Sequence, residues 1–273
     1  MLSSHECIAW TTVHIIGCVA IVTLNIITII VFTKNCSLRK RSTYLLVNLA
    51  VVDMLVGLVG TFTVYELGTY CKLWENSLGL LEDYFLRVLR LLYSISSLVN
   101  IALISVERLH ATARPFRHRF LKRRSYLIAI VSSYLISALF SITSLVIPRI
   151  YPFEKSHNVA TSLISICIVI IVFSYSLIFI KVKCGSQPRH HTAAGMEGRL
   201  TMTLFIVTVV SLMMWLPFIV QSFLWYTTKI FSTYPSHLTC FIIFLVGANS
   251  LVNPLLYAIR IPEFRRTAKA MFC

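Results

Sequence analysis

Seven long apolar stretches, separated by short polar and charged segments, account for most of this 273-residue chain. Each stretch reaches or exceeds the ~20 residues that a helix needs to cross about 30 Å of hydrocarbon. The apolar runs are continuous and do not alternate with polar positions, which indicates helices and not the strands of a barrel. We therefore predict an all-α membrane protein, a single seven-transmembrane helix bundle over residues 1–273. The predicted spans are residues 8–33, 43–67, 79–111, 124–147, 159–183, 197–226 and 236–259.

The segment after the last stretch has a different pattern. Residues 262–272 begin with a proline and place apolar and basic positions on opposite sides. Proline is favoured in the first turn of a helix, and a two-faced basic helix lies in the membrane interface. We predict a short amphipathic helix there.

Composition and charge support this interpretation and add an orientation. Hydrophobic residues make up 57% of the chain and charged residues only 13%, about half the share in soluble domains. Most of the 25 lysines and arginines fall in four segments, residues 34–41, 108–124, 181–199 and 260–269, which lie on one side of the predicted bundle. The positive-inside rule makes that side cytoplasmic and places the N-terminus outside the plasma membrane. The net charge of +15 then indicates anionic membrane lipid as a partner and not nucleic acid.

Three of the eight cysteines are expected on the outer side, namely Cys7, Cys71 and Cys240. At most one disulfide can form among them, and the sequence leaves the pairing open.

Ionised groups inside a span are costly and are usually retained for function. Asp53 lies in the middle of the second stretch, either as a hydrogen-bonded packing group or as an ion or proton site. Pro217 and Pro254 interrupt the last two stretches and predict hinges.

The outer end of the third stretch carries Asp83, Arg87 and Arg90. One interpretation is local pairing, in which Asp83 binds Arg87 and Arg90 either extends to the membrane interface or binds Glu66. The other is a basic floor for an anionic ligand group, which the fork of a guanidinium binds well.

Five motifs in five different stretches resemble those of rhodopsin-like (class A) G-protein-coupled receptors. They are Asn25, Leu49-Ala-x-x-Asp53, Glu107-Arg108, Trp215-Leu-Pro217 and Asn253-Pro-x-x-Tyr257. The resemblance implies a receptor that binds an extracellular ligand and activates a heterotrimeric G protein by outward movement of the sixth helix.

The resemblance also implies roles for individual residues. Arg108 would be held by Glu107 and Glu197 until activation, when Tyr175 and Tyr257 swing inward. Phe116, after Pro115, would dock the G protein. The implied switch residues are Glu107, Arg108, Pro115, Phe116, Tyr175, Glu197, Trp215, Pro217, Asn253, Pro254 and Tyr257. We expect no cofactor. The resemblance implies an allosteric sodium ion, at a site that comprises Asp53, Ser97, Asn249, Ser250 and Asn253.

The sequence says less about the ligand than about the receptor family. Asp83 stands where the family usually has a cysteine, a pattern nearest to the melanocortin, adenosine, cannabinoid and lysophospholipid receptors. Two arginines at the mouth favour an anionic or lipid-like small molecule, with a melanocortin-like peptide or an adenosine-like nucleoside as alternatives. The implied pocket residues are Arg87, Arg90, Leu91, Ser94, Trp215, Phe218, Ile219, Ser222 and Ile243.

Other classes fit the sequence less well. A transporter would need paired repeats and several midplane charges, and an enzyme would need a catalytic cluster within the spans. We therefore expect neither. The short basic tail after Arg266 offers Thr267 as its one hydroxyl group, so we expect weak arrestin coupling.

Overall fold

The computed structural model describes residues 2–35, 43–150, 154–184, 193–228 and 236–271. It also describes their side chains, apart from those of residues 119, 144–150, 154–161, 182–184, 193–201 and 225–228. Helices and no strands occur within these ranges, which confirms the predicted all-α class. The seven long helices are α1 (Ser4–Lys34), α2 (Thr43–Tyr70), α3 (Leu80–Ala113), α5 (Arg123–Ile150), α6 (Glu154–Cys184), α7 (Ala193–Thr228) and α8 (His237–Arg260). Two short helices are α4 (Pro115–Arg119) and α9 (Pro262–Lys269).

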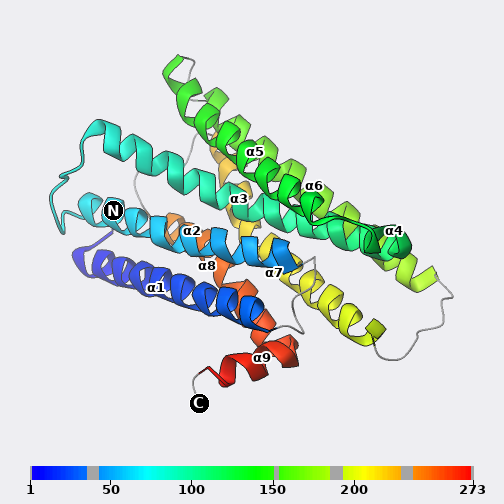
Figure 1. The fold of residues 1–273 in the computed structure, drawn as a ribbon. Helices are drawn as coiled ribbons and strands as arrows, with labels where there is room; N and C mark the ends of the chain where they lie inside the picture. The colour runs from blue at the N-terminus through cyan, green and yellow to red at the C-terminus, as the bar shows by residue number, and fades with distance from the viewer. Residues whose placement is uncertain (1, 36–42, 151–153, 185–192, 229–235, 272–273) are drawn as a thin grey trace.

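The long helices pack into one bundle with α3 at its centre. α3 contacts α2, α5, α6, α7 and α8, and Figure 1 shows it between α2 and α5. α9 turns away from the end of α8 and contacts α8 and α1, below which it lies in Figure 1. It ends at Lys269, before the predicted boundary at residue 272.

The distribution of polar and apolar side chains is that of a membrane protein. All seven long helices contain a stretch long and apolar enough to cross a bilayer. Exposed apolar side chains such as Ile16, Leu135 and Val169 cover the outside, while Asn25 and Asn100 are fully buried. Water would penalise so large an exposed apolar surface, whereas lipid does not.

Buried and partly buried polar groups connect the helices. The Asn48 amide on α2 donates to the Asn100 side chain on α3 over 2.7 Å. The Tyr134 hydroxyl on α5 donates to Asn48 over 3.2 Å. Hydrogen bonds of this kind hold helices together where the hydrophobic effect between them is weak.

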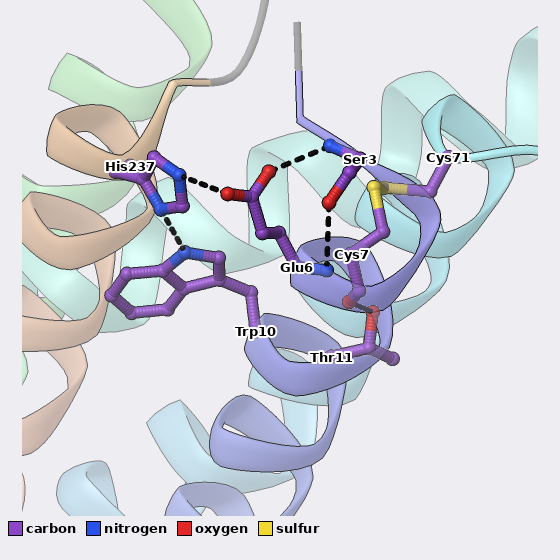
Figure 2. The surroundings of a disulfide bond; sticks show 7 residues. All are labelled: Ser3, Glu6, Cys7, Trp10, Thr11, Cys71 and His237. Carbon is purple, nitrogen blue, oxygen red and sulfur yellow. Dashed lines mark hydrogen bonds and ion pairs between the residues drawn. A yellow bond between two sulfur atoms is a disulfide. The ribbon is translucent and has the colours of Figure 1, made fainter.

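A disulfide fixes one end of the bundle. Cys7, the fourth residue of α1, is bonded to Cys71, just after α2 (Figure 2). Cys240 is buried and not bonded to another cysteine, so the pairing that the sequence left open is Cys7–Cys71. We call this the disulfide end, and we call the opposite end, where α3 ends and α4 and α5 begin, the basic end.

Candidate functional site

The most buried acid in the described part of the chain is Asp53 in α2, with no exposed surface. One of its oxygens accepts hydrogen bonds from Ser97 Oγ of α3 (2.7 Å) and from Ser250 Oγ of α8 (2.8 Å). The other accepts from Asn253 Nδ2 of α8 at 2.6 Å. Asp53 therefore joins three helices, and the structure brings it together with three of the four other residues predicted for a sodium site.

The surroundings of Asp53 contain oxygen atoms without partners. Asn249 is buried on the same helix as Ser250, and the amide oxygens of Asn249 and Asn253 accept no hydrogen bond from the described residues. A carboxylate, two hydroxyls and amide oxygens form the donor set that a hard cation prefers. The residues present therefore fit the predicted ion.

Glu107 and Arg108 lie at the basic end of α3 and are 9% and 5% exposed. Arg108 Nε is 2.6 Å from Glu107 Oε2, so the two neighbours form a buried ion pair. The side chain of Glu197, the other predicted partner of Arg108, lies outside the described side chains.

Glu107 has further partners that the sequence did not reveal. Its Oε1 is 2.8 Å from His118 Nε2 on α4 and 3.5 Å from the Tyr126 hydroxyl on α5. One carboxylate therefore contacts Arg108, the short helix α4 and the first turn of α5. No spacing in the sequence signals this, because His118 reaches Glu107 only when α4 folds back from Pro115.

Phe116, the predicted docking residue, is on the same short helix and is 76% exposed. The contact between His118 and Glu107 thus fixes the helix that presents this aromatic ring at the basic end.

The two tyrosines predicted to move are both buried. The Tyr175 hydroxyl on α6 accepts a hydrogen bond from Thr208 of α7 at 3.3 Å. Tyr257 packs between Phe32 of α1 and Phe264 of α9, with ring centroids 5.6 Å and 6.1 Å away. Pro217 and Pro254 lie inside α7 and α8, and Trp215, two residues before Pro217, is buried against Phe218.

Four charged side chains gather between α2 and α3 towards the disulfide end. Glu66 is paired with both Arg87 (2.5 Å) and Arg90, and Arg87 Nε donates to Asp83 over 2.9 Å. Both guanidinium groups also lie over the Phe62 ring. We call Glu66, Asp83, Arg87 and Arg90 the four-charge cluster. Its ion pairs balance two positive with two negative charges and confirm the local pairing that the sequence allowed.

The remaining residues of the predicted pocket are spread over three helices. Leu91 on α3 and Phe218 and Ile219 on α7 are partly buried against the core. Ser94 is partly buried, Ser222 is buried, and Ile243 on α8 is 41% exposed.

Comparison with known proteins agrees with this geometry. The family model described as 7 transmembrane receptor (rhodopsin family) matches residues 24–257. The chain belongs to this family of receptors. It is therefore a multi-pass membrane receptor, and the predicted absence of enzymatic activity agrees with a family that is not enzymatic.

Several receptors are similar over most of the chain. Mouse neuromedin-U receptor 1 is 25% identical over 96% of this chain and 71% of its own length. Rat melanocortin receptor 5 is 26% identical over 91% of this chain and 79% of its own. The crystal structure of squid rhodopsin has the same fold, with a TM-score of 0.85, 19% identity, and coverage of 100% of this chain and 87% of its own.

The disulfide of this receptor does not involve its third helix. Asp83 replaces a cysteine near the start of α3, and the one bridge among the described residues joins α1 to the end of α2. The first helix is therefore covalently attached to the bundle, and the end of α3 beside it is held by the four-charge cluster.

Proposed function

We propose that this receptor activates a heterotrimeric G protein at its basic end when an extracellular ligand binds at its disulfide end. In this orientation the N-terminus is extracellular and the C-terminus cytoplasmic, as the positive-inside rule predicts. The observation that carries the proposal is the buried Glu107–Arg108 pair, whose carboxylate also contacts α4.

The physical basis is a latch with two states. A buried ion pair is costly to open by removal of one partner, yet an exchange of partners keeps the charges satisfied. When Arg108 leaves Glu107 for a G protein, Glu107 keeps His118 and Tyr126 as partners. Ligand binding shifts such an equilibrium only by its differential affinity for the two states.

We propose a peptide as the ligand. Two of the similar receptors are named for neuromedin-U and for melanocortins, and neither is named for a lipid. The anionic or lipid-like ligand expected from the sequence depended on unpaired arginines, and Glu66 and Asp83 now balance that charge. A peptide with both acidic and basic side chains can exchange partners with the four-charge cluster without leaving a charge unpaired.

We further propose that a sodium ion binds beside Asp53 and stabilises the inactive state. The ion would be held by the Asp53 carboxylate with the oxygens of Ser97, Ser250, Asn249 and Asn253. Its positive charge would offset the cost of a buried carboxylate.

The test is G-protein nucleotide exchange with the full-length receptor in membranes. Arg108→Ala should lower ligand-stimulated exchange more than about tenfold at unchanged surface expression. Arg266→Ala, an exposed arginine of α9, is the matched control and should leave exchange unchanged. Neuromedin-U-like and melanocortin-like peptides are compared with lysophospholipids and fatty acids as ligands. Full exchange by the Arg108 variant contradicts the latch, and a response confined to lipids contradicts the peptide proposal.

A further inference from the structure

The outer halves of α1 and α8 meet along a line of side chains that the receptor mechanism above does not use. On α1 the line comprises Glu6, Trp10, His14 and Gly17, spaced by four, four and three residues. On α8 it comprises His237, Cys240 and Phe244, spaced by three and four. These spacings keep each set on one face of its helix. We call the two sets together the α1–α8 seam.

Specific contacts close the seam at every turn. The Trp10 indole donates to His237 Nδ1 over 3.0 Å, and His237 Nε2 is 3.1 Å from Glu6 Oε1 (Figure 2). Further in, the His14 ring is hydrogen-bonded to the backbone of Cys240 and packs edge-on against Phe244. The seam points towards Ser250, whose carbonyl accepts a hydrogen bond from Asn25 of α1 at 3.0 Å.

The hydrogen bonds of His237 define its protonation state. An indole N–H donates and cannot accept, so His237 Nδ1 must be the unprotonated acceptor. The single proton of the neutral ring is then on Nε2, where it donates to the Glu6 carboxylate. Neutral His237 therefore satisfies both partners at once.

A second proton on His237 destroys this arrangement. The imidazolium donates from both nitrogens, so its Nδ1–H would face the Trp10 N–H and that hydrogen bond must break. The Glu6 contact becomes an ion pair and stays. His237 is also the first residue of α8, where the helix dipole disfavours a positive charge. Protonation therefore breaks the hydrogen bond between Trp10 and His237 and keeps the contact between Glu6 and His237.

We propose that His237 is a binding site for extracellular protons, and that protonation loosens the outer end of α8 from α1. α8 carries Ser250 and Asn253, which bind Asp53, and Tyr257, one of the predicted switch residues. A change at its outer end therefore reaches residues that bear on activation. Histidine is the side chain that changes charge between about pH 5 and pH 8, so acidification of the surroundings is the stimulus.

Among the described residues, few titratable or charged groups lie near His237. Glu6 on α1 is the charged group that contacts the ring, and its other oxygen accepts from the Ser3 backbone at 2.7 Å (Figure 2). His14 is the second histidine of the seam, next to Trp10. The neighbouring segment 229–235, with Lys229, lies outside the described residues. His237 and Glu6 are 60% and 43% exposed at their side chains, so protons reach them freely.

The first test observes the proton site without any G protein. The full-length receptor is labelled with ¹⁵N-tryptophan in lipid nanodiscs, and the Trp10 indole signal is identified by its loss in Trp10→Phe. The signal should shift between about pH 7.5 and about pH 5.5 as the hydrogen bond is lost. His237→Gln, which can accept from Trp10 and donate to Glu6 but cannot gain a proton, should abolish the shift. His5→Gln, the same change at an exposed neighbouring histidine, should keep it. A shift that persists in His237→Gln overturns the proposal.

The second test asks whether the seam acts on signalling. Ligand-free nucleotide exchange should rise about fivefold on acidification of the outer side, the effect of one lost hydrogen bond on an equilibrium. His237→Gln should show no rise, and His5→Gln should respond as the natural receptor does. An exchange rate that is independent of pH, with a normal Trp10 shift, overturns the link to signalling. Absence of exchange at both pH values contradicts the proposed G-protein function instead, and the indole titration still tests the proton site.

Discussion

The two ends of the bundle are held together by different chemistry. At the disulfide end, the Cys7–Cys71 bond, the four-charge cluster and the α1–α8 seam connect α1, α2, α3 and α8. At the basic end, α3, α4 and α5 meet at one buried carboxylate, Glu107. The first end is fixed covalently and by charge pairs that reach solvent, whereas the second depends on buried polar contacts.

This difference suits a receptor. A covalent bond does not exchange partners on the timescale of signalling, so α1 and the end of α2 stay joined at the disulfide end. A buried ion pair is stable until another partner is available, which allows two alternative arrangements of the same helices. The proposed latch between Glu107 and Arg108 at the basic end uses this property.

The largest expected effect comes from removal of the disulfide. A bond that closes a separation of 64 residues contributes about 4 kcal/mol in the chain-entropy treatment. Cys7→Ser and Cys71→Ser should each lower the thermal unfolding midpoint of the purified receptor, and the two decreases should be equal. The midpoint of the double variant should be no lower than that of either single variant. Cys18→Ala, at a free cysteine of α1, is the control and should change the midpoint little. Additive losses in the double variant would show that the cysteines do not act as a pair.

Substitution of the buried acid should have the next largest effect. Asp53→Asn removes the charged acceptor of three hydrogen bonds, a loss of about 1–3 kcal/mol. The thermal midpoint of the natural receptor should be higher in sodium than in potassium chloride, and this difference should disappear in the variant. Ser97→Ala, which removes one hydrogen bond of the three, should reduce the sodium effect only in part. An Asp53→Asn receptor that still distinguishes the two salts would exclude this sodium site.

At the basic end, Glu107→Gln should raise signalling. The neutral amide keeps the shape of the side chain but removes the charge that holds Arg108, so ligand-free nucleotide exchange should rise about tenfold. Glu263→Gln, the same change in the first turn of α9, should leave the rate unaltered. A Glu107→Gln receptor with unchanged or lower ligand-free exchange would show that this pair is not the latch.

The smallest expected effect probes the seam. A Cβ atom on Gly17 would lie 3.2 Å from the Phe244 ring, whereas one on Gly247 would meet no atom within 4 Å. Both changes to alanine gain helix propensity, so the difference between the variants isolates the packing cost. Gly17→Ala should be less stable than Gly247→Ala by about 1 kcal/mol, measured by thermal unfolding. Equal stabilities would mean that α1 and α8 separate at this point without cost.

Much of the architecture could be predicted from local chemistry. The long apolar stretches that became α1 and α8 follow from the hydrocarbon thickness, because a helix satisfies its own backbone wherever it lies in the bilayer. Asp53 was identifiable as a special residue for the same reason, since a midplane carboxylate is costly unless it has partners. Ser97, Ser250 and Asn253 were assigned to it only through the family resemblance.

The partners of charged residues at the helix ends were less predictable. The anionic pocket expected around Arg87 and Arg90 depended on whether Glu66 pointed towards them, and the sequence admitted both answers. The contact of His118 with Glu107 was missed because it depends on how the chain turns between α3 and α5. Neither Glu6 nor Trp10 nor His237 carried a signal, because the residues that meet are more than two hundred positions apart.

The membrane environment, the seven helices and the uneven distribution of charge could be predicted without a structure, because each depends on composition over about 20 consecutive residues. The partner of Cys7, the acids that balance the two arginines and the ring nitrogen of His237 that carries the proton follow only from the packing of the helices. These depend on the rotation of each helix about its axis and on its neighbours. Short-range hydrogen bonds form or fail over a few ångströms, a scale that apolar periodicity does not define.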